Sequence, residues 1–117
     1  MNKALFSSVK QDWETPTDVY AALDYEFHFN FDPCPADALL DGLSIEWGSI
    51  TFCNPPYAQI SKWVEKAFFS WKEGKTVVLL IPSRTDTRWW HQWIMRATEI
   101  RFIKGRLRFG AATNNAP

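Results

Sequence analysis

Residues 49–57 are Ser49-Ile50-Thr51-Phe52-Cys53-Asn54-Pro55-Pro56-Tyr57, a short β-branched and aromatic run followed by a rigid polar loop. The run predicts a strand that ends at the two prolines. Apolar residues then recur at helical spacing from Ile60 to Trp71, with Gly74 after them, which predicts a helix. The continuously apolar run 76–81 predicts a second strand, covered on both faces. Strand, helix and strand in this order predict a parallel pair joined by a right-handed crossover.

Upstream of this unit the sequence predicts a helix and a further strand. Thr15 is suited to be the N-cap of the helix, Pro16 its first residue, and Asp18 the partner in a capping box. This helix should run to about Tyr25 and bury one stripe formed by Val19, Ala22 and Leu23. Residues 27–31 alternate, which predicts a strand with Phe27, Phe29 and Phe31 on one face, ending at Asp32-Pro33.

The segments further along the chain are less regular. Residues 34–48 predict mostly loop, with a short helix around residues 36–40. A helix is predicted over residues 87–97, with Trp90, Trp93, Ile94 and Ala97 in the core. Residues 98–103 and 106–109 predict two strands joined by a turn at Lys104-Gly105, and residues 110–117 a flexible tail.

Together these elements indicate an α/β protein with a mostly parallel, doubly wound sheet. The length of 117 residues fits a single domain over residues 1–117. Ligands of such sheets bind beyond the carboxyl ends of the strands. Three loops are expected there: Asp32–Cys34, Asn54–Tyr57 and Pro82–Arg84.

Charge and cysteine content restrict the function further. The net charge is zero, but residues 1–71 carry four Lys/Arg and ten Asp/Glu, whereas residues 72–117 carry nine and three. The basic second half predicts a surface that binds a polyanion. No apolar run is long enough to span a membrane, and we expect a cytosolic protein without a signal peptide. Cys34 and Cys53 lack metal-ligand spacing, so we expect free thiols and no metal.

The tetrapeptide Asn54-Pro55-Pro56-Tyr57 is suited to chemistry on a planar amino group. Such a group is a poor nucleophile, and a site that methylates it must accept hydrogen bonds from its hydrogens. The Asn54 side chain and the Pro55 carbonyl can supply two acceptors, which successive prolines hold rigid. Tyr57 offers a flat face on which an extruded base can stack. A simple turn after a strand is the alternative reading of the same residues.

The sequence resembles the phage-type DNA N-6-adenine methyltransferases, which are related to the DNA adenine methyltransferases. The resemblance rests on Trp13-Glu-Thr-Pro16, Phe31-Asp-Pro33, Trp47, Asn54-Pro-Pro-Tyr57, the segment from Leu79 to His91, and Ile103-Lys-Gly-Arg-Leu-Arg-Phe-Gly110. It implies a Rossmann-like fold and an enzyme that transfers a methyl group from S-adenosylmethionine to the 6-amino group of a flipped adenine in double-stranded DNA. Such an enzyme protects DNA from restriction or marks it.

The resemblance also implies roles for individual residues. Asn54, Pro55, Pro56 and Tyr57 match the catalytic motif. Trp13, Thr15 and Pro16 resemble the segment that closes over the cofactor, and Asp32 and Pro33 the strand end that holds it. Two features depart from the pattern. After Asp32 there is no glycine until Gly42, and family members continue beyond Pro117, so we expect the final strand to be missing.

Basic residues of the second half are candidates for contact with DNA phosphates. They are Arg84, Arg88, Lys104, Arg106 and Arg108, with Arg101 as a further candidate. Trp89 is a candidate for base stacking.

Two other functions remain open from the sequence. The same tetrapeptide could act on the glutamine amide of a protein, although the basic second half favours nucleic acid. A non-catalytic DNA-binding or interaction protein derived from the same fold is the second alternative.

Overall fold

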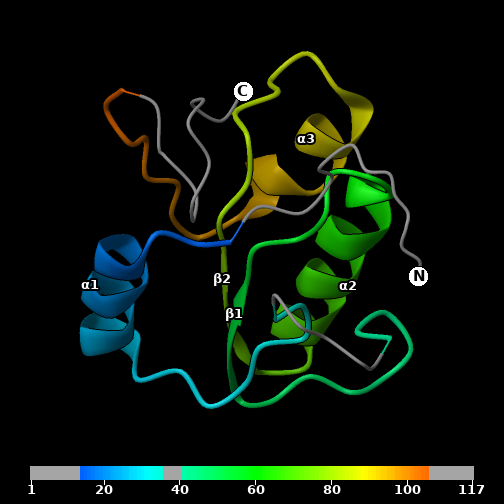
Figure 1. Cartoon of the computed structure of the whole chain (residues 1–117). Helices are drawn as coiled ribbons and strands as arrows, with labels where there is room; N and C mark the ends of the chain where they lie inside the picture. The colour runs from blue at the N-terminus through cyan, green and yellow to red at the C-terminus, as the bar shows by residue number, and fades with distance from the viewer. Residues whose placement is uncertain (1–13, 36–40, 106–117) are drawn as a thin grey trace.

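The computed structural model describes residues 14–35 and 41–105. In these residues the elements are α1 (Thr17–Phe27), β1 (Ile50–Cys53), α2 (Ile60–Lys72), β2 (Thr76–Leu79), α3 (Arg88–Gln92) and the 3₁₀ helix η1 (Ile94–Arg96) (Figure 1). The predicted strand, helix and strand over residues 49–81 are therefore confirmed in type and order. The expectation that the second strand is covered on both faces is wrong: β2 ends at Leu79, its first residue is exposed and the rest are half-buried, since no described strand pairs with its outer edge. None of the helices described is both long and apolar enough to cross a membrane.

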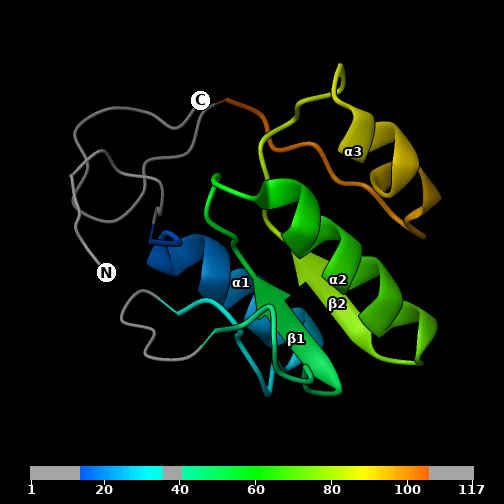
Figure 2. The ribbon, with the colours of Figure 1, turned by 90° about the vertical axis from the view of Figure 1, so that its right-hand side faces the viewer.

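β1 and β2 form a parallel pair, with Ile50 opposite Thr76 and Cys53 opposite Leu79. α1 and α2 lie on opposite faces of this pair, so the described part has three layers (Figures 1 and 2). This arrangement is a small α/β structure, as predicted.

β1 is buried on both faces because its side chains alternate between the two helices. Cys53 joins a core cluster with Trp47, Trp63 and Ala67, on the side of α2. Phe52 faces the other way, and its ring meets that of Tyr20 in α1 edge-on, with centroids 5.1 Å apart. Fully burying a side chain such as Phe52 contributes about 1.5–3 kcal/mol to folding.

The second half of the core joins α2 to the helices that follow β2. Val64 packs with Trp90 and Ile94, and Leu79 contacts this cluster as well as the first one. α2 then ends in a tight turn in which Gly74 has a φ of 101°. Glycine adopts this left-handed conformation without strain, which explains why the helix stops there.

The predicted strand at residues 27–31 is largely wrong. α1 continues through Phe27, and His28 ends it in a left-handed conformation with its N–H bonded to the Asp24 carbonyl. Asp24 also accepts the N–H of Phe29 at 2.9 Å, and these bonds divert the backbone from a strand. Only Phe31 forms a bridge, parallel to Thr51. Because β2 occupies one edge of β1, this bridge lies on the other edge.

The expectation that the three phenylalanines share one face is also wrong. The Phe29 ring stacks on that of Phe27 and lies tilted against those of Tyr20 and Phe52, on the α1 side. Phe31 instead packs against the cluster that contains Trp47 and lies on the α2 side.

The start of α1 differs from the predicted cap. Pro16, and not Thr15, is the N-cap residue, and no side chain caps the helix. The helix begins one residue later than expected because the Thr15 hydroxyl bonds to Asn54 instead. The predicted stripe is only partly buried: Ala22 is exposed, whereas Val19 and Leu23 are half-buried.

The predicted helix over residues 87–97 is divided into α3 and η1. Thr87 caps α3, its hydroxyl accepting the N–H of Trp90 at 3.3 Å. Trp90 and Ile94 are buried as predicted, whereas Trp93 is half-buried and Ala97 is exposed. Residues 98–103 form no strand. The predictions for residues 36–40, 106–109 and 110–117 lie outside the described residues.

Candidate functional site

Three loops leave the sheet at the same end, where the carboxyl ends of the strands lie, because the bridge at Phe31 and the two strands all run parallel. They follow Phe31, β1 and β2. The second and third begin side by side, since the N–H of Leu80 bonds to the Cys53 carbonyl at 3.0 Å. The sequence placed its candidate site residues on these loops, and the structure brings the loops together.

Asn54 is the first residue after β1, and its side chain is half-buried. Its Nδ2 donates a hydrogen bond of 3.1 Å to the hydroxyl oxygen of Thr15, 39 residues earlier in the chain. Two residues predicted to belong to one site, one as catalytic and one as cofactor-binding, are therefore in direct contact.

The rest of the tetrapeptide forms a rigid loop. Pro55 is fully buried, and Pro56 and Tyr57 are half-buried. The Tyr57 carbonyl accepts the N–H of Ile60 at the start of α2, which fixes the loop to the helix. Burial raises the pKa of Tyr57 above its ordinary value of 10.0, so its phenol is neutral at physiological pH. A half-buried neutral ring is suited to stacking rather than to proton transfer.

Asn54 and Tyr57 line a cavity of about 830 Å³. α1 also lines it, with the carboxylate of Asp18 and the apolar side chains of Val19 and Leu23, and the rest of the lining comes largely from α2, β2 and the segment after η1. A cavity of this size, mostly apolar with a few polar groups, is typical of sites for small molecules and cofactors.

The family model described as DNA N-6-adenine-methyltransferase (Dam) matches residues 3–117. The chain belongs to this family. The resemblance noted from the sequence is thereby confirmed. Comparisons with curated proteins and with solved structures gave no match.

In this Dam-family chain the loop after Phe31 is held without a glycine-rich turn. The N–H of Cys34 donates to Asp32 Oδ1 at 2.8 Å. Burial raises the pKa of Asp32, and the bond from Cys34 partly offsets that rise. Burial raises the pKa of the Cys53 thiol well above its ordinary value, and Cys34 and Asp32 add to the rise, so this thiol is neutral.

Pro33 is fully buried, so its side chain has no surface for a cofactor. A Cβ on Gly42 would overlap the carbonyl oxygen of Pro33 and the ring of Trp63. The carbonyl of Gly42 also accepts the indole N–H of Trp47 at 2.8 Å. Gly42 therefore lets its segment pack closely against the loop after Phe31, at a distance in sequence where no glycine motif would reveal it.

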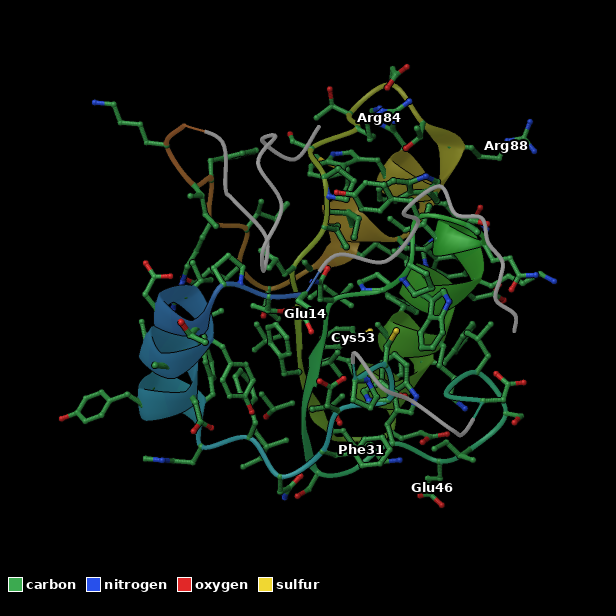
Figure 3. The ribbon with its side chains drawn as sticks, viewed as in Figure 1. Glu14, Phe31, Glu46, Cys53, Arg84 and Arg88 are labelled. Carbon is green, nitrogen blue, oxygen red and sulfur yellow. The ribbon has the colours of Figure 1, made fainter. Side chains whose placement is uncertain are left out.

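The basic residues predicted to contact DNA are placed in different ways. Arg84 and Arg88 are exposed beyond the carboxyl ends of the strands (Figure 3). Lys104 is exposed on the segment after η1. Arg101 is paired with Glu26 and Glu99 instead. Trp13, Arg106 and Arg108 lie outside the described residues.

Trp89 is half-buried and packs against the second core cluster. It also lines a smaller cavity with Arg88 and Gln92 on the surface of α3.

Sequence reasoning missed that α1 lines the cavity beside Asn54 and Tyr57. Val19 and Leu23 were assigned to the core, but they line the cavity, together with Asp18. The helical spacing of these two residues predicts an apolar face of the helix, but it does not indicate what that face contacts. The contact between Thr15 and Asn54 has no signal in the spacing of the two residues.

Proposed function

We propose that this protein is a DNA adenine methyltransferase that transfers a methyl group from S-adenosylmethionine to the 6-amino group of an adenine flipped out of duplex DNA. The observation that carries the proposal is the position of Asn54. It follows a central strand of the sheet directly, lines a cavity of cofactor size, and stands three residues before the half-buried ring of Tyr57.

Asn54 and Pro55 act on the amino group of the base. The Asn54 side-chain oxygen and the Pro55 carbonyl accept its two N–H groups, which draws the lone pair of the nitrogen out of the plane of the ring. Both acceptors are neutral, so they stabilise the positive charge that develops on nitrogen through dipoles alone. The two prolines limit the motion of the loop, and this preorganisation lowers the entropic cost of reaction.

Tyr57 provides the surface on which the extruded base stacks. A base cannot reach a cofactor while it remains paired in the duplex. The tyrosine ring supports this role, because Tyr57 lines the cavity and is only half-buried. Stacking on an aromatic side chain is worth about 1–3 kcal/mol per base.

The residues around the cavity fit S-adenosylmethionine, which supplies an electrophilic methyl group on a positively charged sulfur. Val19 and Leu23 offer an apolar wall for a purine ring, and Asp18 a carboxylate that can accept hydroxyl or ammonium groups. Asp32, Thr15 and Pro16 lie near the carboxyl ends of the strands and contribute to binding of the cofactor. The role of Pro33 is to support this loop, because its ring is buried.

Duplex DNA is proposed to bind over the carboxyl ends of the strands. Arg84 and Arg88 are exposed there and would contact phosphates, as would Lys104 and the more distal Arg106 and Arg108. Membership of the Dam family favours adenine over a protein glutamine amide as the acceptor. We infer that residues 1–117 form one domain whose sheet, with Phe31, β1 and β2 in this order, follows the Rossmann-like arrangement.

The test is transfer of labelled methyl from S-adenosylmethionine to unmethylated duplex DNA, followed by analysis of the nucleosides. We expect labelled N6-methyladenine from the native chain. The variant Asn54→Ala should lose at least about a hundredfold in kcat, as when one stabilising donor or acceptor is removed from an active site. Label in cytosine, or an Asn54→Ala variant with native activity, would contradict the proposal.

A further inference from the structure

The hydroxyl of Thr15 does not cap α1, although its position in the sequence suggests that it would. Thr15 precedes α1, but Pro16 is the N-cap, and no side chain caps the helix. The hydroxyl oxygen instead accepts the hydrogen bond from Asn54 Nδ2, at 3.1 Å and in a partly buried environment. Glu14 precedes Thr15 in the chain and Cys53 precedes Asn54, and Figure 3 shows both of these labelled residues at the same end of β1.

The orientation of the Asn54 amide matters for its proposed chemistry. An amide has a donor end and an acceptor end, and only the acceptor end can receive the N–H of an adenine amino group. If the amide turned over, its NH₂ would face the amino group of the base, and two donors would oppose each other. A partner that holds Nδ2 directs Oδ1 away from that partner.

We propose that Thr15 is a positioning residue for methyl transfer, because its hydroxyl oxygen holds Nδ2 of Asn54 and so directs Oδ1 to the amino group of the substrate base. The inference rests on the function proposed above and deepens it. When the base donates to Oδ1, the amide becomes more polarised and its Nδ2–H a stronger donor to Thr15, so the two bonds reinforce each other.

The experiment compares Thr15→Val, which keeps the shape of the side chain and removes the hydroxyl, with Thr15→Ser, which keeps the hydroxyl. Leaving a partly buried donor without its acceptor should lower kcat about tenfold in Thr15→Val. We expect near-native kcat in Thr15→Ser. Because Thr15 is also placed among the residues that bind the cofactor, kcat is measured at saturating S-adenosylmethionine, and calorimetry reports any change in the dissociation constant separately. Thr17→Val is the matched control, since Thr17 is exposed two residues later.

A second background separates amide orientation from a general effect of Thr15 on the site. In Asn54→Asp both side-chain oxygens are acceptors, so there is no wrong orientation to prevent. We expect Thr15→Val to lower kcat by less than about threefold in that background, against about tenfold with Asn54. Equal losses in both backgrounds, or a loss confined to cofactor affinity, would overturn the inference.

The hydrogen bond can also be followed without any activity. In an NMR spectrum with assigned side-chain amides, one Hδ2 proton of Asn54 should exchange slowly and lose this protection in Thr15→Val but not in Thr17→Val. An unprotected Hδ2 in the native chain would overturn the inference. A native chain that methylates no adenine would overturn the proposed function, and the positioning role with it. An active native chain with an equally active Thr15→Val would overturn the positioning role alone.

Discussion

Arg101 holds the carboxylate of Glu26 through two hydrogen bonds, from Nη1 to Oε1 at 2.8 Å and from Nη2 to Oε2 at 2.6 Å. The guanidinium also lies 5.6 Å from the centroid of the Phe27 ring. These contacts attach the segment after η1 to the end of α1, and residues of both line the cavity. The pair therefore fixes two walls of the candidate site relative to each other.

Replacing Glu26 by Gln should destabilise the fold slightly and in a pH-dependent way. The hydrogen bond from Arg101 lowers the pKa of Glu26 in the folded state. A lowered folded pKa contributes stability above the unfolded pKa, and this contribution is lost as pH falls through the folded pKa. We expect Glu26→Gln to melt below the native chain at pH 7, with a difference that shrinks as pH falls below the unfolded pKa, as measured by circular dichroism.

Glu99→Gln is the control for this pair, since Glu99 contacts Arg101 only through Nε and lies two residues away. It connects no separate elements and should have the smaller effect. A larger loss for Glu99→Gln would show that Arg101 does not act by joining α1 to the later segment.

Tyr57→Ala should weaken capture of the base more than binding of the cofactor. Loss of one stacked ring corresponds to about 1–3 kcal/mol, which is roughly a 5- to 150-fold rise in KM for DNA. Tyr57→Phe keeps the ring and should remain close to native. Because burial raises the pKa of Tyr57 above 10.0, the native rate should show no inflection from this residue below pH 10. Steady-state kinetics with DNA and cofactor varied separately measure both constants.

The part of the fold that sequence alone could predict is the unit from β1 to β2. Its signals are local: helical spacing from Ile60, a continuous apolar run from Thr76, and two prolines after Cys53. Gly74 marked the end of α2, where a positive φ is required. Each signal depends on residues close together in the chain, and each predicted the type and position of its element, although β2 ends two residues before the apolar run and is only half-buried.

The errors arose where hydrogen bonds or pairing partners that the residue pattern does not show decide the local conformation. The alternation at Phe27–Phe31 was real, but Asp24 and His28 bond in a way that extends α1 to Phe27. Residues 98–103 alternate as a strand would, yet a strand needs a neighbour for its backbone, and no other described segment pairs with it. The three loops predicted to lie together do follow parallel segments of one sheet, whereas the position of α1 beside the cavity depends on packing that the sequence does not encode locally.

Gly42→Ala should destabilise the fold through overpacking. A Cβ at this position would overlap the Pro33 carbonyl and the Trp63 ring, and the core around Trp63 leaves no room for it. Such insertions cost about 1–3 kcal/mol. Gly74→Ala is the comparison, because a Cβ there meets nothing within 4 Å and is opposed only by the φ of 101°. Urea denaturation should show the larger loss for Gly42→Ala, and cofactor affinity should fall in that variant alone.

Arg88→Gln should weaken binding to DNA by a similar amount whatever the base sequence of the DNA. Each phosphate contact contributes about one unit to the slope of log K against log salt, so the variant should have a slope about one unit smaller. Lys72→Gln is the control. Lys72 is exposed at the end of α2, just before β2 begins, and so lies at the end of the sheet away from Arg88. Fluorescence titrations of duplex DNA at several salt concentrations measure the slopes. An unchanged slope for Arg88→Gln would place the DNA elsewhere.

Asp32→Asn should stabilise the fold at neutral pH while weakening cofactor binding. Burial raises the folded pKa of Asp32, so its ionised form destabilises the folded state, and the stability that protonation gives is lost as pH rises through the folded pKa. Asparagine keeps an acceptor for the Cys34 N–H and removes the charge. The variant should therefore exceed the native chain in urea at pH 7, and the difference should vanish at pH 3.

Asp41→Asn separates the charge of Asp32 from the geometry of its turn. Asp41 Oδ1 accepts the N–H of Leu43, two residues later, at 3.0 Å, which is the same kind of turn as at Asp32, but its side chain is exposed. We expect this variant to leave both stability and affinity for S-adenosylmethionine unchanged. If Asp32→Asn gained stability and kept native affinity, the carboxylate would be a cost to the fold with no part in binding. A gain in stability with a loss of affinity is the result expected of a carboxylate that binds the cofactor, because sites of this kind are built at the expense of stability.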